Sequence, residues 1–278
     1  MHFQLGEFVG LEFERRFSNR RHVVFHKPVP TWLVRMFVRL GFGITILFFE
    51  YDSVRDYYFR LYRSSTDLRK CQASLDRMLG GATRAESLQI RVSRKYDLSV
   101  VSRLTGLKHL HIGSRLKNPL DLGQNMQLET LSLGPAISSQ VTGLAKLENL
   151  SNVILGTASV DFLQDLPNST RSLSMSGWIP AGLGTEYLRG LRELSLDSVP
   201  SMSFEGLAPL LEITHLTLDD VKKVENPERL KEFFPNLQVL QILSTDLRIR
   251  RSLIDNLPRG CQLIQNISAE ALAKLNAM

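Results

Sequence analysis

The sequence contains little cysteine, and this limits both the cellular compartments and the classes of fold that are compatible with it. Only Cys71 and Cys261 occur among 278 residues, far apart and without a C-x-x-C pair. Two isolated cysteines argue against the disulfide framework of a small secreted protein and favour a reducing compartment. We therefore expect two small buried thiols and a cytoplasmic protein.

A long uninterrupted hydrophobic run is also missing. The most apolar window, residues 32–49, contains Arg35 and Arg39 near its centre, and a charge at the middle of a bilayer costs roughly 2.5–3.5 kcal/mol. The start of the chain carries glutamates at positions 7, 12 and 14, where a secretion signal needs a basic start and an apolar run. We expect neither a membrane span nor a signal peptide.

Catalytic signatures are missing as well. We find no activated nucleophile, no phosphate-binding glycine loop and no acid/base pair at a diagnostic spacing. The segments Gly41-Phe42-Gly43 and Gly80-Gly81 are too short for such a loop and fit helix ends. The prediction is a protein without enzymatic activity, cofactor or metal.

Positive charge is concentrated at one end of the chain. Residues 1–80 hold 13 Lys/Arg and 8 Asp/Glu, a difference of +5, whereas residues 81–278 hold 21 and 20, a difference of +1. Attraction for an acidic partner would therefore come from the N-terminal part. The arginines are dispersed and lack the interleaved aromatic residues that bind single strands, so we prefer a solvated basic surface and keep a nucleic-acid-associated protein as an alternative.

What is present instead is a short phrase, L-x-x-L-x-L, that recurs along most of the chain. Its clearest copies are Leu107-x-x-Leu110-x-Ile112 and Leu128-x-x-Leu131-x-Leu133. The middle position of the copies falls at residues 88, 110, 131, 153, 173, 194, 216 and 240, with steps of 20 to 24 residues. A final, degenerate copy falls at Cys261-Gln262-Leu263. Such a period indicates one supersecondary unit repeated in tandem.

This phrase and its period resemble those of the leucine-rich-repeat family, over about residues 82–263. The resemblance implies an α/β solenoid in the form of a horseshoe or arc, with about 8–9 repeats and a parallel sheet on its concave side. The family's asparagine three residues after the last leucine is missing, and its positions hold Ser93, Arg115, Ala136, Ala158, Trp178, Val199, Val221 and Thr245. The architecture is therefore expected without assignment to a particular subfamily.

Residues 1–81 are expected to form an N-terminal α/β cap that covers the open end of the repeat core. A weak alternation over residues 2–26 predicts a hairpin, and the apolar run 44–49 predicts a buried strand. Ser53 can begin a long helix that Gly80-Gly81 terminates. This helix would deliver the chain into the first repeat strand.

A helix is predicted between the hairpin and the buried strand. After Pro30, the apolar residues Leu33, Met36, Phe37 and Leu40 fall on one helical face. The segment 29–40 also resembles the opening helix of an F-box, which would make the protein a substrate-recognition adaptor of a ubiquitin ligase. The preceding hairpin and the strand that follows depart from that family, so we favour an ordinary amphipathic helix of the cap.

The return segments between the repeat strands are expected to differ from one another. Asn226-Pro227-Glu228 places a capping residue, a proline and an acid ahead of an apolar face, which predicts a helix. Residues 161–165 and 203–207 suggest single turns. Short amphipathic helices on both sides of Cys261-Gln262-Leu263 are expected near the end of the chain, with residues 264–278 forming the C-terminal cap.

Side chains between the leucines of each predicted strand point to the opposite, concave face because successive side chains alternate. Along this face the residues change from basic and imidazole-bearing, through small and neutral, to acidic. The candidate partner-binding residues are Arg91, His109, His111, Thr130, Ser132, Asn152, Ser174, Ser176, Trp178, Glu193, Asp197, His215 and Asp219. The small central residues would leave the backbone approachable, and Trp178 is either an apolar anchor for a partner or part of a return segment.

Two groups on this face allow other chemistry. The acidic group is Glu193, Asp197, His215 and Asp219, on adjacent strands about 4.8 Å apart; it could recognise Lys/Arg, bind a metal or stay hydrated. Convergent ligands are not evident, so recognition and hydration are the interpretations kept open. His109 and His111 have no acid or cysteine in register and are interpreted as solvent or partner contacts.

These patterns favour a non-catalytic module that binds another protein on its concave face. One such role is that of a stoichiometric inhibitor, such as an immunity protein that neutralises a toxin, by analogy at the level of fold. The F-box-like adaptor and the nucleic-acid-associated protein are the alternatives. The sequence does not identify the partner or the oligomeric state.

Overall fold

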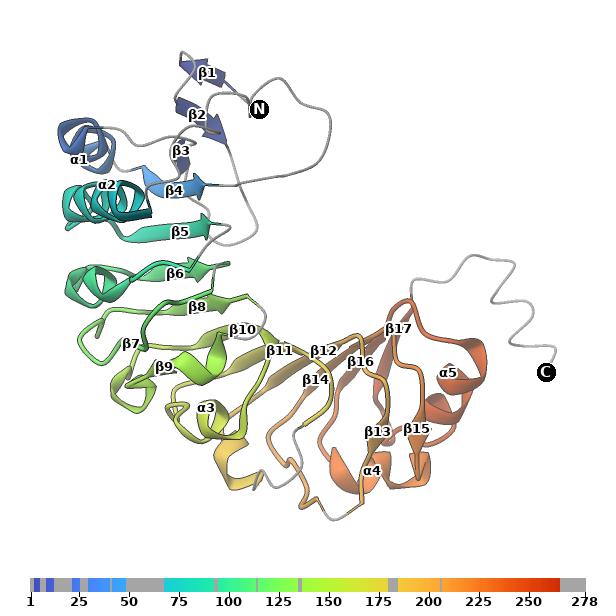
Figure 1. The fold of residues 1–278 in the computed structure, drawn as a ribbon. Helices are drawn as coiled ribbons and strands as arrows, with labels where there is room; N and C mark the ends of the chain where they lie inside the picture. Colours follow the sequence, from blue (N-terminus) through green and yellow to red (C-terminus); the bar gives the residue numbers. More distant parts are fainter. Residues whose placement is uncertain are drawn as a thin grey trace. The chain divides into compact units, whose positions relative to one another are not determined.

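The computed structural model describes residues 3–5, 9–12, 22–25, 30–40, 42–48, 68–92, 95–113, 115–134, 137–179, 185–205 and 207–265. The chain forms two compact units, residues 1–150 and residues 151–278. Each unit combines parallel strands with a few helices, so the chain is α/β, as predicted (Figure 1). No helix within the described ranges is long and apolar enough to cross a membrane.

The first unit begins with antiparallel strands and continues with parallel ones. Its strands in sheet order are β1 (Phe3–Leu5), β2 (Val9–Glu12), β3 (His22–Phe25), β4 (Gly43–Phe48), β5 (Ser87–Val92), β6 (His109–Ile112) and β8 (Thr130–Leu133). The pairs β1-β2 and β2-β3 are antiparallel, which confirms the predicted hairpin and adds a third strand to it. From β3 to β8 every pair is parallel.

Two helices cover one side of this part of the sheet (Figure 1). Helix α1 (Thr31–Arg39) joins β3 to the parallel strand β4, and α2 (Leu68–Gly81) precedes β5. Helix α1 packs against α2 and β4. Any part of α2 that begins near Ser53 lies outside the described residues.

The buried side of α1 differs from the predicted one. Val34 and Phe37 are the buried residues, and the Phe37 ring meets the edge of Phe42 with centroids 5.8 Å apart. Met36 and Leu40 are 39% and 64% exposed. Apolar residues surround this short helix on nearly every side, so periodicity could not select the face that packs against α2.

The second unit contains parallel strands in simple sequence order. They are β10 (Asn152–Thr157), β11 (Ser172–Ser176), β12 (Glu193–Asp197), β14 (His215–Asp219), β16 (Val239–Ile242) and β17 (Gln262–Gln265). The middle leucines of the phrases, such as Leu194, Leu216 and Leu240, stand directly opposite one another. Leu263 continues this row, so a strand forms at the degenerate copy as predicted.

A recurring backbone pattern holds each strand to the one before it. Arg192 O accepts hydrogen bonds from Thr214 N at 2.9 Å and His215 N at 3.0 Å. The same two-donor arrangement occurs at equivalent carbonyls, those of Glu86, Lys108, Ser151, Arg171 and Thr214. Because a register slip would leave these polar groups unpaired, the pattern fixes which residues share a row.

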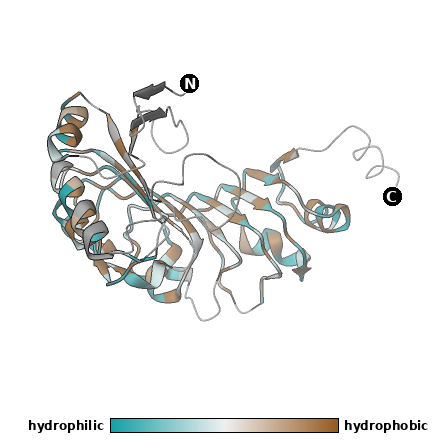
Figure 2. Cartoon of the chain, turned by 45° about the horizontal axis from the view of Figure 1, so that its top comes forward, coloured by the Kyte–Doolittle hydropathy of each residue, from teal (hydrophilic) through white to brown (hydrophobic). Residues whose placement is uncertain are grey.

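Several strands of the second unit alternate between the core and the opposite face. Strands β11, β12 and β14 bury their leucine or methionine rows and leave the residues between them partly or fully exposed. Figure 2 shows hydrophobic and hydrophilic residues alternating along the strands of each unit. Burial of these rows supplies the main favourable free energy of folding.

The return segments are short and varied. They contain β7 (Leu120–Asp121) paired with β9 (Val141–Thr142), β13 (Met202–Ser203) paired with β15 (Val224–Glu225), the helices α3 (Val160–Gln164), α4 (Leu230–Phe233) and α5 (Leu247–Ile254), and the 3-10 turns η1 (Ser99–Arg103), η2 (Ser138–Gln140), η3 (Leu144–Lys146), η4 (Thr185–Leu188) and η5 (Pro227–Arg229). Helix α3 is capped by Ser159, whose Oγ accepts from Phe162 N at 3.3 Å.

The predicted helix after Asn226 forms in two short pieces, η5 and α4. Asn226 does not act as the expected side-chain cap. Its backbone is left-handed, with φ of 53° and ψ of 53°, and its side chain makes no capping hydrogen bond. The residue serves as a turn that asparagine tolerates better than most residues.

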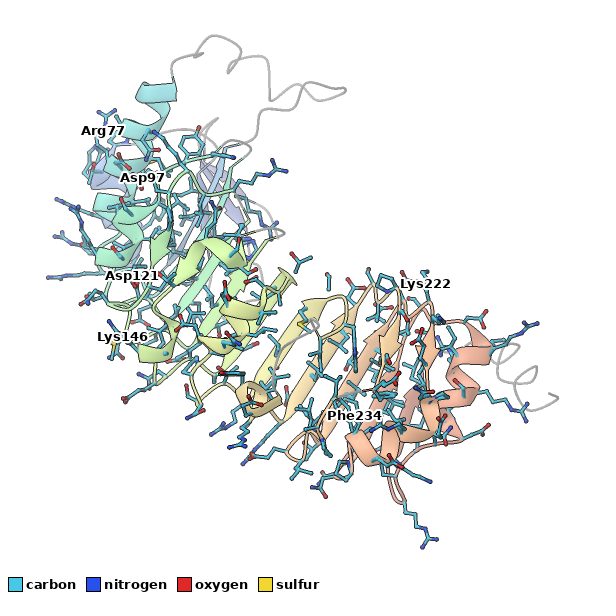
Figure 3. All side chains as sticks on the ribbon, turned by 60° about the horizontal axis from the view of Figure 1, so that its bottom comes forward. Arg77, Asp97, Asp121, Lys146, Lys222 and Phe234 are labelled. Carbon is cyan, nitrogen blue, oxygen red and sulfur yellow. The ribbon has the colours of Figure 1, made fainter. Side chains whose placement is uncertain are left out.

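Four aromatic rings form the core beneath the return segments of the second unit. Phe204 and Phe234 are fully buried and Phe233 nearly so, and the edge of Trp178 meets Phe204 with centroids 5.7 Å apart. Phe233 and Phe234 are 4.7 Å apart in an edge contact (Phe234 is labelled in Figure 3). The cluster fills the space that the varied return segments leave over the leucine rows.

At the C-terminal end a helix precedes the last strand, as expected, but the strand extends into the predicted cap. Helix α5 lies before β17, and residues 264 and 265 belong to this strand. The remainder of the expected cap lies outside the described residues. Cys261 is partly exposed rather than buried.

Candidate functional site

The face of the second unit opposite to the leucine rows is built from short polar side chains. Ser174, Ser195, Thr217 and Gln241 stand in one row across β11, β12, β14 and β16, and each is partly exposed. Thr217 Oγ1 donates to Gln241 Oε1 at 3.5 Å. This row forms a shallow polar surface that offers both donors and acceptors.

Acidic groups flank this row at both ends of the strands. Glu193 lies opposite His215, and Asp197 lies opposite Asp219, so the sequence-predicted acidic group forms two pairs at opposite ends of the strands and not one cluster. Glu193, Asp197 and His215 are exposed and Asp219 is partly buried. Two neighbouring carboxylates at the ends of β12 and β14 create a local negative potential.

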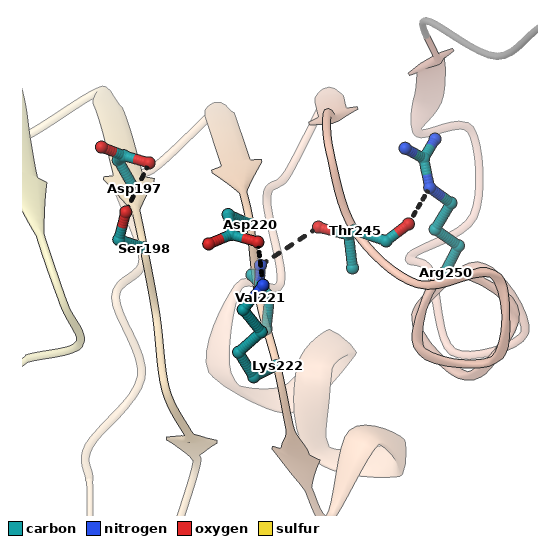
Figure 4. A network of polar contacts seen from close by, with 7 residues as sticks. All are labelled: Asp197, Ser198, Asp220, Val221, Lys222, Thr245 and Arg250. Atoms are coloured by element: carbon teal, nitrogen blue, oxygen red, sulfur yellow. Dashed lines mark hydrogen bonds and ion pairs between the residues drawn. The ribbon is translucent and has the colours of Figure 1, made fainter.

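The hydrogen bonds show which of these groups are already engaged. Ser198 Oγ donates to Asp197 Oδ1 at 3.1 Å (Figure 4). The Nδ1 atom of His215 lies 3.0 Å from Thr214 Oγ1. One carboxylate oxygen of Asp219, Oδ1, is buried without a hydrogen-bond partner in the structure.

Arg250 is a charged residue near this group that the sequence did not single out. It is 5% exposed. Its Nε donates to Thr245 O at 2.7 Å (Figure 4), and its Nη1 donates to Ile242 O at 3.3 Å. Burial lowers the pKa of its guanidinium, and the negative charge of Asp219 opposes that shift. The only sequence signal for the burial of Arg250 is its position three residues before the buried Leu253, which places both residues on the inner side of α5.

The central candidates are less uniform. Asn152, Ser174 and Ser176 are partly exposed on β10 and β11, as expected for the face. Trp178 belongs to the return side instead, because its Nε1 donates to Ser203 O at 3.0 Å and its ring joins the aromatic cluster. The interpretation of Trp178 as a return-segment residue is therefore the one that the contacts support.

The candidates of the first unit form a more enclosed network. Arg91 Nε donates to His111 Nε2 at 3.2 Å, and His111 Nδ1 lies 2.8 Å from Ser132 Oγ. Burial, followed by the charge of Arg91, lowers the pKa of His111 to about 4. His109 and Thr130 are partly exposed, whereas Ser132 is only 4% exposed. Ser132 is therefore enclosed, whereas Arg91 and His111 remain partly exposed.

The network is also unsuited to nucleophilic catalysis. Because Arg91 donates to Nε2, the proton of the neutral imidazole lies on Nδ1 and is donated to Ser132 Oγ. An imidazole in this state cannot accept a proton from the serine. Among the described residues no group of three or more His, Cys, Asp or Glu could hold a metal ion.

No protein-family model and no curated protein matches the sequence. The arrangement of side chains is therefore the basis for any functional conclusion. Exposed short polar residues and paired carboxylates can recognise hydrogen-bond donors on another molecule.

Proposed function

We propose that the chain is a leucine-rich-repeat solenoid that binds another protein on the polar face of β10, β11, β12, β14 and β16. The period of 20 to 24 residues between the phrases supports the repeat assignment. Parallel strands in sequence order, with their leucines in rows, support it independently.

The observation that carries the binding proposal is the exposure of this face. Strands β11, β12, β14 and β16 present Ser174, Ser195, Thr217 and Gln241 in register, with Ile154 beside them on β10, and these partly exposed residues alternate with the buried leucine rows. Short side chains lose little conformational entropy when a partner covers them. The face can therefore accept a protein surface at low cost.

The paired carboxylates define the chemistry of the partner. Asp197 and Asp219 are adjacent in register; Asp197 is exposed and Asp219 partly exposed. A Lys or Arg side chain placed between them would gain two charged acceptors. The proposed partner thus presents a basic side chain toward the ends of β12 and β14.

The proposed mode of action is stoichiometric inhibition, as when an immunity protein covers the working surface of a toxin. A module with a polar binding face and no catalytic group acts by occupancy alone. The scarcity of cysteine supports a cytoplasmic site of action.

The F-box-like alternative receives no support from the N-terminal elements. That family continues its opening helix with further helices, whereas α1 is followed within four residues by β4, which pairs parallel with β3 and β5. The β-α-β arrangement uses α1 as a crossover between strands.

The test is a capture experiment from a lysate of the native host with two matched double variants. The Asp197→Lys/Asp219→Lys variant should lose at least about tenfold in affinity for the captured protein, about 1.4 kcal/mol. The control, Glu212→Lys/Glu228→Lys, makes the same change of charge at exposed residues of the return segments and should bind as the parent chain does.

Two results would count against the proposal. Equal capture by both variants would remove the acidic end of the face from the interface. If the captured protein is an enzyme whose activity is unchanged at a one-to-one ratio, inhibition is not the mode of action.

A further inference from the structure

Helix α1 exposes an apolar stripe that the core does not use. Trp32 is 65% exposed, Met36 39% and Leu40 64%. They are four residues apart, so they lie along one side of the helix. The opposite side already packs through Val34 and Phe37. The stripe is therefore additional to the residues that attach the helix to the fold.

Such exposure is concentrated here. Seven large hydrophobic residues are exposed in the described part of the chain, and three of them are on or directly after this helix. The other four, Met126, Tyr187, Leu211 and Ile264, are single residues dispersed over other elements. Isolated apolar residues are normal on protein surfaces, whereas a contiguous stripe marks an interaction surface.

Positive charge accompanies the stripe. Arg35 and Arg39 are exposed and lie three residues after Trp32 and Met36, respectively. Arg77 is exposed on the neighbouring helix α2 (Figure 3), and Thr31 Oγ1 donates to its carbonyl at 3.2 Å. Residues 15–49 contain seven Lys/Arg and no Asp/Glu. The exposed arginines Arg35, Arg39 and Arg77 outnumber the one exposed acid of α2, Asp76, so the described neighbours of the stripe favour an anionic partner.

We propose that this side of α1 docks onto an anionic lipid surface, independently of the protein-binding face. Apolar side chains and arginines alternate along about 12 Å of helix, at 1.5 Å per residue. At the surface of an anionic bilayer, acyl chains and phosphate groups lie close together. The apolar side chains can contact the acyl chains while the neighbouring arginines contact the phosphates. Tryptophan is favoured at that boundary, and arginine can extend its head group to the phosphates.

The observations favour lipid over a partner helix. An acidic protein would need carboxylates interleaved with apolar pockets to match the alternation of Trp32, Arg35, Met36, Arg39 and Leu40. A lipid surface is fluid and supplies both kinds of group at every position. The helix would lie in the plane of the interface, since its nine residues are too few to span a bilayer.

Vesicle co-sedimentation with the full chain tests this inference. Vesicles of equal parts phosphatidylglycerol and phosphatidylcholine should bind the chain, and pure phosphatidylcholine should bind it at least about tenfold more weakly. Added salt should weaken the binding. On binding, the fluorescence of Trp32 should shift to shorter wavelength, and the Trp32→Phe variant should lose this shift although Trp178 remains.

Two matched pairs of variants locate the contact. Trp32→Ser/Leu40→Ser should lose at least about tenfold in vesicle affinity, whereas Met126→Ser/Leu211→Ser should keep it. Arg35→Glu/Arg39→Glu should abolish the preference for anionic lipid, whereas Arg192→Glu/Arg259→Glu should retain it. All eight residues are exposed, so the variants should fold.

Each contrary result has a definite meaning. Failure to bind anionic vesicles overturns the inference, as does binding that the α1 variants leave unchanged. If the α1 variants instead abolish binding to an RNA or DNA oligonucleotide, or abolish a dimer seen by light scattering, the occupant is a nucleic acid or a second copy of the chain.

Discussion

At the scale of single residues, His111 shows how a polar face becomes part of the interior. Its imidazole is held between Arg91 and Ser132 and stays neutral, and burial lowers its pKa to about 4. In the unfolded chain His111 has the ordinary pKa of 6.5. Between about pH 4 and pH 6.5 the imidazole therefore binds a proton in the unfolded chain but not in the folded chain. The stability that the neutral state provides is therefore complete above pH 6.5 and decreases as the pH falls toward 4.

We expect the loss from His111 to reach on the order of 3 kcal/mol at pH 4, since one pKa unit corresponds to about 1.4 kcal/mol. The His111→Asn variant cannot titrate and should unfold with a shallower pH dependence between 6.5 and 4, measured by urea denaturation. A parent slope in His111→Asn would assign the effect to other groups.

Asp97 contributes at lower pH and can be separated from His111. Its carboxyl accepts hydrogen bonds from Ser99 N at 2.9 Å and Asn118 Nδ2 at 3.0 Å. These bonds, those of Ser99 first, keep its pKa below the ordinary 3.8. Stability from this group is present above that value and is lost only as the pH falls below it.

Individual residues were predictable where the repeat period fixes their environment. The leucines of the phrases are buried in rows because each occupies the same place in its strand. The period could not show that Trp178 packs in the return segments, that Arg250 is buried, or that Met36 and Leu40 face outward. The environment of each of these residues depends on which neighbouring segment packs beside it. The sequence does not reveal that segment, because the return segments share no common sequence.

At the scale of elements, the sequence predicted the strands more accurately than their connections. The last of the phrases, at Leu263, forms β17, because a short apolar alternation beside an existing strand is sufficient to extend the sheet. The segment after Asn226 has every signal of a single helix, yet it forms η5 and α4. A left-handed residue and a short span between two strands leave no room for longer helical structure.

Side-chain hydrogen bonds between successive segments satisfy buried backbone groups in parts of the chain. Thr245 Oγ1 accepts from Val221 N at 3.2 Å (Figure 4). In the first unit the buried Asn125 donates through Nδ2 to Val101 O at 3.2 Å and to Leu104 O at 3.0 Å. Different residues thus satisfy buried backbone groups of the preceding segment.

The aromatic cluster should be the main stabilising element of the return side in the second unit. Phe234 is fully buried against Phe204 and Phe233, so Phe234→Ala should reduce the free energy of unfolding by about 3–5 kcal/mol. Tyr187→Ala removes an aromatic ring that is 42% exposed and should cost less than about 1 kcal/mol. Equal losses in urea denaturation would show that the cluster is not a packed core.

At the scale of the whole molecule, the chain separates two kinds of surface. The second unit presents a short polar face with paired carboxylates, and the first unit presents a basic, apolar helix. The charge asymmetry of +5 against +1 between residues 1–80 and 81–278 was evident in the sequence. The exposed stripe on α1 was not, because exposure is decided by tertiary packing and not by composition.

The polar face was predictable from alternation alone, since every second residue of a strand points away from the leucine rows. Which part of this face is exposed enough to contact a partner could not be predicted from the sequence. In the first unit Ser87, Gln89 and Ser132 are at most 4% exposed, whereas Glu193 and His215 are exposed in the second. We therefore assign partner recognition to the second unit, where side chains are accessible.

Site-specific photo-cross-linking tests the central claim most directly. A photoreactive phenylalanine derivative is placed at Glu193 or His215 on the polar face, and at Glu212 or Glu228 on the return segments, each exposed. The account predicts that the captured protein cross-links to the first two positions and not to the last two. Cross-links formed only from Glu212 or Glu228 would contradict it.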